Sequence, residues 1–454
     1  MIKNFIKNHP SLFFLILMLI HYLSAYPGGM TGDSYHQFIQ SLSGSYDSHH
    51  PPTMAMVWSV FNIVYKGPQT ILLLHFAMFW LAIVLLYKAD KNNKFRWLYF
   101  IIPFLPAVLS QSGMIWKDVG FANGYFLVFA TCTYYLYKQQ KPSILVLISI
   151  AIICFYGESV KFQAKFIAPI LVLFIVSLYF KSWFKRIIAC LIFSTILIGT
   201  NTLIIRYFTI DTHGEQIRQF FDLAGIAVDI DDDSVIPDYI KEDPIYSFDK
   251  VKAVYTPWIV NPLFFAPETR VFKSTLDETK LTALNSAFYS AITTHPISYL
   301  KHRKNNFAGL LRVHRDGKYA TSTMDHPDDV IKFHQFENNI LKNLFVKYIA
   351  STHRYLLQNR LTAAILVLYI ILLARYSYIR KKNQQKATIK KPIECTVLLY
   401  SIAISIGYSL TLFFTTMAAD YRYYLLVRIM VFFSLPIFLK LMLAPKKINE
   451  TIKE

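Results

Sequence analysis

The sequence is poor in cysteine and lacks the common nucleotide-binding motifs. Only four cysteines occur in 454 residues, and all of them stand in apolar segments: Cys132, Cys154, Cys190 and Cys395. The one large polar region, 207–358, has none, so the sequence predicts no disulfide framework there. The whole sequence also contains no Walker motif, no GxGxxG and no kinase or hydrolase signature. These absences argue against chemistry driven by ATP.

Acidic residues are also scarce, with 28 Asp and Glu against 47 Lys and Arg and a net charge of +19. Such an excess can indicate a nucleic-acid-binding protein. The distribution of charge argues against this, because region 207–358 carries 19 acidic and 17 basic residues. The basic excess lies in short loops between apolar blocks, as in membrane proteins. No nucleic-acid partner is therefore expected.

Apolar residues are abundant, at 54% of the chain, and they come in blocks. The blocks predict an all-α polytopic membrane protein with about ten transmembrane helices. The N-terminal block is similar to a signal peptide, but Ser24-Ala25-Tyr26 is a poor cleavage site, so we expect a retained signal anchor. The predicted spans are 11–27, 68–87, 97–114, 118–137, 142–156, 166–180, 184–206, 359–376, 394–416 and 424–443.

The charges of the short loops predict the orientation of these spans. With both termini inside, the inner loops hold 20 Lys and Arg and the short outer loops hold 5. The positive-inside rule then predicts cytoplasmic N- and C-termini. The same orientation places the polar motifs of the outer loops on one face of the membrane, together with region 207–358.

Two short segments of the first outer loop predict interfacial helices rather than spans. Residues 51–66 are apolar but begin with two prolines and end at a Lys-Gly-Pro sequence, and a span here would reverse the charge pattern of everything after it. Residues 34–44 are expected to form a similar helix. Region 207–358 is expected to be a mixed, mainly helical extracytoplasmic domain.

The first outer loop also gathers the residues best suited to chemistry. Asp33 is a candidate general base toward a hydroxyl group, or alternatively a helix N-cap. His50 stands before Pro51-Pro52, where it is a candidate phosphate ligand or a histidine that faces water at a helix start. Tyr35 and His49 are candidate cavity residues. No metal-ligand spacing is evident, so a metal site is not indicated, although a divalent metal is left open.

Other outer turns carry further candidates. Lys117-Asp118 forms a very short hairpin, in which Lys117 is a candidate phosphate ligand. Asp118 is a candidate catalytic residue that orients Lys117 or a substrate hydroxyl; the alternative for the hairpin is a snorkelling membrane anchor. Glu158 and Lys161 are candidate cavity residues.

The last span opens with Asp420-Tyr421-Arg422-Tyr423-Tyr424, and Arg428 follows inside it. Arginine in a span is costly and usually has a partner or a function. Arg422 is a candidate clamp for a lipid phosphate. Asp420 and Arg428 are candidate cavity residues, and the tyrosines are alternatively an aromatic-belt anchor.

The order of these motifs resembles the GT-C superfamily of integral membrane glycosyltransferases, in the bacterial branch related to protein O-mannosyltransferases and aminoarabinose transferases. Gly32-Asp33-Ser34 is similar to the acidic position of the first outer loop, although relatives often have Glu after the Asp. His50-Pro51-Pro52 resembles a basic-Pro-Pro turn that faces the donor phosphate, and Lys117-Asp118 resembles a second acidic position. The resemblance covers residues 1–206 as a seven-span catalytic module, followed by domain 207–358 and a three-span module, 359–454.

The resemblance implies a glycosyltransferase with its active site on the outer face of a bacterial cytoplasmic membrane. The donor would be a polyprenyl-phosphate-linked sugar, and the acceptor a lipid, glycan or protein. Asp33 and Asp118 would be catalytic, and His50, Lys117 and Arg422 would bind the donor phosphate. The resemblance implies no particular cofactor.

Three other functions remain open from the sequence. A polysaccharide polymerase or ligase would depend on Arg303, Arg312, His314 and Arg315 and would tolerate changes at Asp33. A lipid-glycan transporter would favour pseudo-symmetric halves and charges within spans. The sequence shows no such halves, and most of its charges lie in loops. The remaining alternative is a non-catalytic assembly scaffold.

Overall fold

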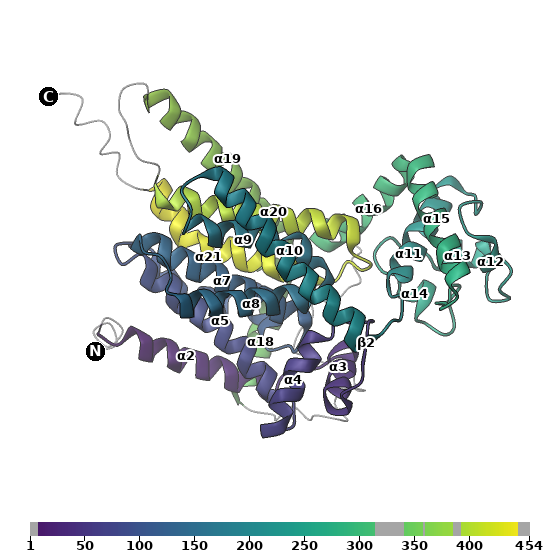
Figure 1. Ribbon diagram of the computed structural model, residues 1–454, viewed down its shortest axis with the longest axis horizontal. Helices are drawn as coiled ribbons and strands as arrows, with labels where there is room; N and C mark the ends of the chain where they lie inside the picture. The colour runs from purple at the N-terminus through teal and green to yellow at the C-terminus, as the bar shows by residue number, and fades with distance from the viewer. Residues whose placement is uncertain (1–7, 314–339, 357–358, 385–391, 444–454) are drawn as a thin grey trace.

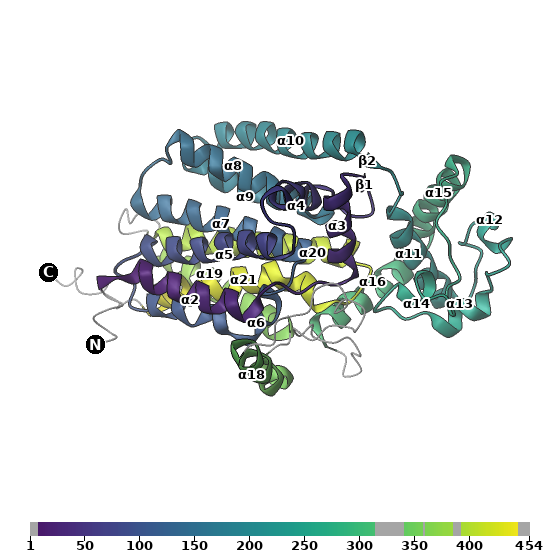
Figure 2. The ribbon, with the colours of Figure 1, turned by 90° about the horizontal axis from the view of Figure 1, so that it is seen from below.

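The computed structural model describes residues 8–313, 340–356, 359–384 and 392–443, and it is helical almost throughout (Figures 1 and 2). The apolar body contains α2 (Pro10–Ala25), α3 (Gly32–Ser43), α4 (Thr53–Val64), α5 (Gln69–Ala89), α6 (Pro106–Ser112), α7 (Lys117–Lys138), α8 (Ile144–Ser159), α9 (Ala168–Ser177), α10 (Trp183–Phe208), α18 (Ile340–Leu356), α19 (Asn359–Gln384), α20 (Ile393–Thr415) and α21 (Leu425–Met442). A second group of helices, here named the outer domain after its predicted location, contains α11 (Glu215–Ile230), α12 (Asp238–Lys241), α13 (Phe248–Val254), α14 (Asn261–Phe264), α15 (Glu278–Thr294) and α16 (Pro296–Leu311).

The prediction of an all-α membrane protein is confirmed. Within the described residues, five helical segments are long and apolar enough to cross a membrane: Gln69–Ala89, Trp183–Phe208, Asn359–Ile379, Ile393–Thr415 and Tyr421–Met442. Helices α2, α4, α8 and α9 are apolar but shorter. The body is therefore built from helices that suit a bilayer, with several of less than full length.

The predicted continuous span over 97–114 is wrong. This segment divides into two 3₁₀ turns, η1 (Arg96–Phe100) and η2 (Ile102–Phe104), followed by the seven-residue helix α6. Pro103 and Pro106 are the physical reason, because each lacks the backbone N–H that an α-helix needs. Prolines are favoured at the start of a helix, where η2 and α6 place them.

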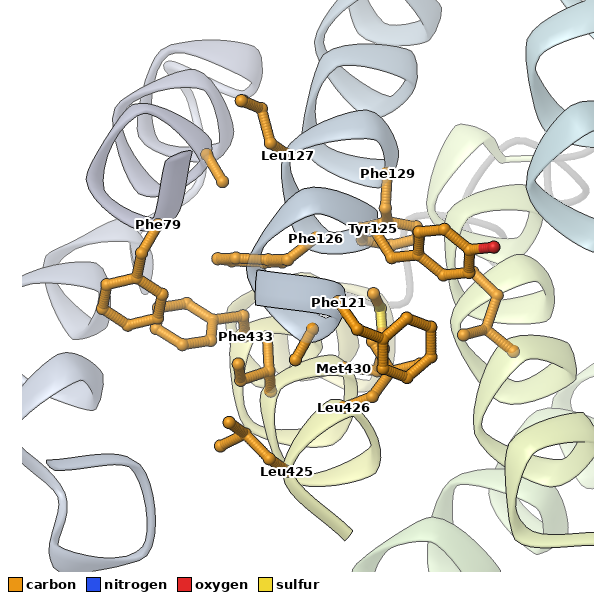
Figure 3. Close-up of a cluster of buried hydrophobic side chains, with 14 of the residues drawn as sticks. Phe79, Phe121, Tyr125, Phe126, Leu127, Phe129, Leu425, Leu426, Met430 and Phe433 are labelled. Atoms are coloured by element: carbon orange, nitrogen blue, oxygen red, sulfur yellow. The ribbon is translucent and has the colours of Figure 1, made fainter. Parts of the chain in front are cut away.

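Helix α7 lies at the centre of the body, between α5 and α21 (Figure 3). All of its residues from Asp118 to Thr133 are buried, so it is covered on every side. The Phe126 ring packs at a tilt against Phe433 of α21, with ring centroids 4.7 Å apart, and the Phe79 ring of α5 lies 6.0 Å from that of Phe126. Because α5 and α21 pack against α7 on both sides, the first turn of α7 holds Lys117 and Asp118 in fixed positions.

The two short helices predicted in the first outer loop are both present, as α3 and α4. Helix α4 follows the Pro51-Pro52 turn, as expected. Its C-terminal turn is strongly exposed, with Ile63 83% and Val64 87% accessible, which suits the predicted interfacial position. Between the two helices, strand β1 (Tyr46–Asp47) pairs in parallel with β2 (Thr209–Ile210) and joins this loop to the end of α10.

The outer domain projects from one end of the body (Figures 1 and 2). Its own core includes Phe220 and Phe272, whose rings stack with centroids 5.0 Å apart. Helix α18, predicted as part of region 207–358, instead packs on the body through Ile349, which lies with Leu109 of α6. Helix α2 begins, and α21 ends, at the end of the body away from the outer domain (Figure 1).

Candidate functional site

The segment before α3 is pinned to the segment before α7. Gly29 donates its N–H to the Gly113 carbonyl at 2.8 Å and accepts from Ile115 at 2.7 Å. Trp116 Nε1 donates to Thr31 Oγ1 at 2.9 Å. These bonds bring the start of α3 beside the start of α7, although 81 residues separate Ser34 from Ile115. The segment before α3 and the segment before α7 therefore share one site.

Asp33 lies in the first turn of α3 but does not cap it. The N-cap is Thr31, and Ser34 accepts from the Thr31 N–H at 3.4 Å and donates to the Ile115 carbonyl. The alternative that Asp33 is an N-cap is therefore wrong, because the helix begins two residues earlier than that role requires. The Asp33 carboxylate is left to interact with other elements.

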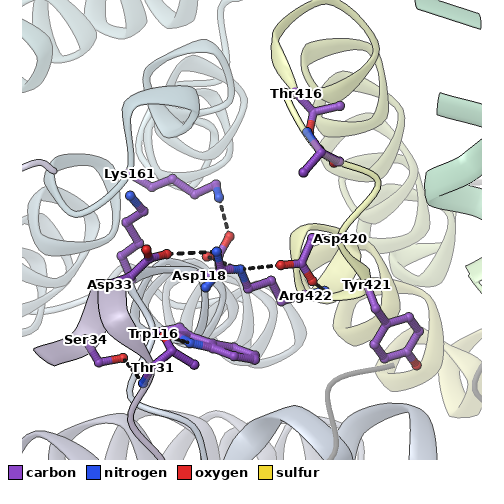
Figure 4. A network of polar contacts seen from close by, with 12 residues as sticks. Thr31, Asp33, Ser34, Trp116, Asp118, Lys161, Thr416, Asp420, Tyr421 and Arg422 are labelled. Carbon is purple, nitrogen blue, oxygen red and sulfur yellow. Dashed lines mark hydrogen bonds and ion pairs between the residues drawn. The ribbon is translucent and has the colours of Figure 1, made fainter. Parts of the chain in front are cut away.

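Asp33 pairs with a residue 389 positions away. Arg422 Nη2 donates to Asp33 Oδ2 at 2.8 Å, and Arg422 Nε lies 2.8 Å from Asp420 Oδ2 (Figure 4). The same Nε lies 3.9 Å from Asp118 Oδ2. The guanidinium group thus joins three carboxylates. The side chains of Asp33 and Asp420 are partly open, at 35% and 30% exposed, whereas Asp118 is buried.

His50 links the opposite side of Asp33 to Lys117. Lys117 Nζ lies 2.6 Å from His50 Nδ1, and His50 Nε2 lies 3.8 Å from Asp33 Oδ1. A protonated lysine donates to Nδ1, which leaves the imidazole proton on Nε2, facing the carboxylate. The His50 side chain is only 6% exposed. The alternative that it faces water at a helix start is therefore wrong.

Asp118 forms a buried ion pair with Lys161, whose Nζ donates to Asp118 Oδ1 (Figure 4). The two side chains are 2% and 3% exposed. The Lys161 ammonium also lies 4.6 Å from the centre of the Tyr423 ring. The pair lies inside the protein, where it supports the site without opening to solvent.

Aromatic rings hold the guanidinium group of Arg422 in place. Its Cζ lies 4.9 Å from the Trp116 ring and 5.4 Å from the Tyr423 ring. The 3₁₀ turn η4 (Tyr421–Tyr424) that carries it is capped by Asp420, which accepts from the Arg422 N–H at 3.1 Å. The orientation of Arg422 is therefore fixed by both its backbone and its side-chain contacts.

The charges around Asp33 set the protonation states of the exposed part of the site. Burial alone would raise the pKa of the Asp33 carboxyl, but the charges of Arg422 and Lys117 outweigh burial and hold this pKa below its ordinary value. Burial lowers the pKa of His50 well below its ordinary value, and the Lys117 charge lowers it further. At neutral pH the site therefore presents an ionised Asp33 and a neutral His50.

The remaining candidates lie in different surroundings. Glu158 is buried and accepts from Asn201 of α10 at 3.3 Å, and Arg428 donates to Asn359 at 2.7 Å and to the Tyr421 carbonyl at 2.9 Å. Tyr35 is half-buried on α3 and packs against the apolar core. His49 lies at the rim, with its ring centre 4.7 Å from that of His50. Arg428 thus supports the backbone of η4 rather than the site itself.

The sequence did not predict one pair of residues near His50, namely His36 and Asp47. His36 Nε2 lies 3.2 Å from Asp47 Oδ2, and the His36 ring centre lies 5.7 Å from that of His50. The only sequence signal was the closeness of His36 to Asp33 in the Tyr-His-Gln cluster of the same loop. In the part of the chain that the structure describes, no group of three or more His, Cys, Asp or Glu side chains has an arrangement suited to a metal ion.

Of the four residues expected of a polymerase or ligase, the structure describes Arg303 and Arg312. Arg303 is fully buried, where it pairs with Asp222. Arg312 ends α16 in a left-handed conformation, with φ of 56°. His314 and Arg315 lie outside the described residues.

The buried Asp118–Lys161 pair leads to a prediction about stability. Lys161→Met should lower the free energy of unfolding by about 3–5 kcal/mol, because it leaves the buried Asp118 carboxylate without its nearest cation. The measurement is thermal unfolding of the purified protein in detergent. Lys165→Met is the matched control, since Lys165 is exposed four residues away on the same segment. Equal unfolding temperatures for the two variants would contradict a structural role for the pair.

Comparisons with known proteins give no relative from which to assign this site: no family model, no curated protein and no solved structure matches the chain.

Proposed function

We propose that the chain is a membrane glycosyltransferase of the GT-C type that transfers a sugar from a polyprenyl phosphate to a hydroxyl group. The acceptor is a glycan, a lipid or a protein, and the reaction takes place on the outer face of a bacterial cytoplasmic membrane. In this proposal the ten predicted segments all lie in the membrane, with 97–114 as a broken segment, and the termini are cytoplasmic.

The observation that carries the proposal is the position of Lys117 beside Asp33. The ion pairs of the site join carboxylates to Lys161 and Arg422. Within the described residues, Lys117 has no carboxylate within salt-bridge distance and contacts the neutral His50 instead. A partly exposed carboxylate near a cation that has no carboxylate at salt-bridge distance suits a substrate that brings both a hydroxyl group and a phosphate.

The reaction follows from these positions. The acceptor oxygen attacks the anomeric carbon, and its proton passes to the Asp33 carboxylate. The bond from the anomeric carbon to the phosphate oxygen breaks, and its electron pair leaves with the lipid phosphate. Lys117, Arg422 and the Nε2–H of His50 stabilise the charge that develops on that oxygen. Attack from the face opposite to the phosphate inverts the anomeric centre.

The other charged residues act through those that touch substrate. Asp118 and Asp420 orient the guanidinium group of Arg422, and Lys161 neutralises Asp118. Asp118 is accordingly a positioning residue in this proposal. Helix α4 begins three residues after His50 and ends in the exposed apolar turn of Ile63 and Val64. The donor's polyprenyl chain would therefore lie in the bilayer next to this helix.

The proposal is tested by transfer of a labelled sugar from polyprenyl phosphate in membranes that contain the protein, compared with membranes that lack it. We expect label in an acceptor fraction only when the protein is present. Extension of an existing polyprenyl-linked glycan, without transfer from the single-sugar donor, would favour a polymerase. Movement of the lipid-linked sugar across the membrane, without any new bond, would favour a transporter.

A further inference from the structure

The outer domain grips the loop that leads into the site. Ile259 and Ala418 form an isolated antiparallel bridge, in which Val260 N–H donates to the Met417 carbonyl at 3.0 Å and Ala419 N–H donates to the Trp258 carbonyl at 2.6 Å. This loop, 416–420, joins the end of α20 to η4. Arg422 is the second residue after this loop, so the position of the loop determines where the guanidinium group of Arg422 lies.

A buried side chain strengthens this grip. Arg303 of α16 has a fully buried side chain, and its Nη1 donates to the Thr416 carbonyl at 2.7 Å. Its Nη2 donates to Asp222 of α11, which is also fully buried. One guanidinium group therefore spans the domain's own core and the first residue of the loop, which a single ammonium group could not do.

The surroundings of Arg303 are those of a fixed anchor. His302 Nε2 lies 3.2 Å from Asp222 Oδ1, and Tyr255 Oη lies 2.7 Å from His302 Nδ1. Burial lowers the pKa of His302, so the imidazole is neutral and the charges of Asp222 and Arg303 balance each other. A balanced and fully enclosed group of this kind holds one geometry, because any displacement would leave a buried charge without its partner.

We propose that Arg303 is a positioning residue for the site: by holding the Thr416 carbonyl, it fixes loop 416–420 and thereby the place of Arg422 against Asp33. The consequence for sugar transfer rests on the function proposed above, whereas the anchoring of the loop does not. The outer domain then helps to position Arg422 in the site.

The test uses the full-length protein with Arg303→Lys. Lysine keeps a positive charge beside Asp222 but gives up the bond to Thr416, so the domain should still fold. We expect backbone amide hydrogen exchange in 416–424 to become about tenfold faster or more, as for loss of one charge-assisted hydrogen bond. Exchange in the core of α11 should not change. The turnover number should fall about tenfold, with little change in the KM for the donor. Arg218→Lys, in the same domain, is the control.

A cross-link separates positioning from folding. In an antiparallel bridge of the Ile259–Ala418 kind the Cα atoms lie about 4.5 Å apart, within the range of a disulfide. Adding Ile259→Cys and Ala418→Cys to Arg303→Lys should restore slow exchange and turnover under oxidation and lose both under reduction.

Unchanged exchange in 416–424 for Arg303→Lys would overturn the proposal. So would restored exchange without restored turnover. If the wild type transferred no sugar, the proposed function would fail, and the exchange measurements alone would still decide whether Arg303 anchors the loop.

Discussion

Asp33→Asn should reduce sugar transfer by about 100- to 10,000-fold, the usual contribution of a positioned general base, while the protein reaches normal levels in the membrane. Asparagine has nearly the shape of aspartate but cannot take the proton of the acceptor hydroxyl. The measurement is initial rate of transfer from a labelled polyprenyl-phosphate sugar at equal protein amounts. Asp249→Asn is the control, because Asp249 has a carboxylate 94% exposed in the outer domain.

The low pKa of Asp33 is compatible with this role. In glycosyl transfer the transition state resembles an oxocarbenium ion, and the attacking hydroxyl becomes acidic only as its bond to carbon forms. A weak base can therefore accept the proton late. The donor also changes the base, because its phosphate would neutralise the cations that hold the pKa of Asp33 low. Binding of the donor should thus make Asp33 more basic at the point where it is needed.

Full activity of Asp33→Asn would remove Asp33 from the chemistry and would favour the polymerase or ligase alternative. Asp33→Glu distinguishes the need for a carboxylate from the need for its position. The longer side chain keeps the charge near Arg422 but moves it by about one bond length, so we expect partial activity. Equal loss in both variants would indicate that the exact position of the carboxylate governs the rate.

Local features of this fold could be read from the sequence because their causes are local. Pro51-Pro52 predicts the start of α4, and the apolar blocks predict the long helices that suit a membrane. The broken segment 97–114 shows the limit of reading hydropathy alone. Its composition is that of a span, but two prolines remove the hydrogen bonds that a continuous helix requires.

The candidate site could be predicted only in part. The sequence placed Asp33, His50, Lys117 and Arg422 in outer turns, but it held no information on which turns meet. The meeting depends on the bonds of Gly29 to the segment before α7, and on a loop held by the outer domain. The pairing of Lys161 with Asp118 was equally hidden, because nothing in the sequence relates two charges 43 residues apart.

Arg422→Gln should reduce transfer by about 100- to 1,000-fold, the loss expected when one charge-stabilising donor is removed from an active site. Glutamine cannot neutralise the leaving phosphate, and it cannot join Asp33 to Asp420. Arg422→Lys should retain more activity than Arg422→Gln, because lysine keeps the positive charge. It should stay below the wild type, because lysine contacts one carboxylate at a time. Arg206→Gln is the control, since Arg206 is exposed at the end of α10.

The pH dependence of Arg422→Gln distinguishes its effect on the phosphate from its effect on Asp33. Burial favours the neutral carboxyl, and Arg422 is the strongest of the charges that oppose it. Without that charge the pKa of Asp33 rises, and the ionised form is lost at a higher pH as the solution is made more acidic. The acidic limb of the pH–rate profile should therefore move to higher pH than in the wild type, and it should move less in Arg422→Lys. A uniform fall in rate with an unmoved acidic limb would mean that Arg422 serves the phosphate alone, and that the ionisation of Asp33 is maintained by Lys117.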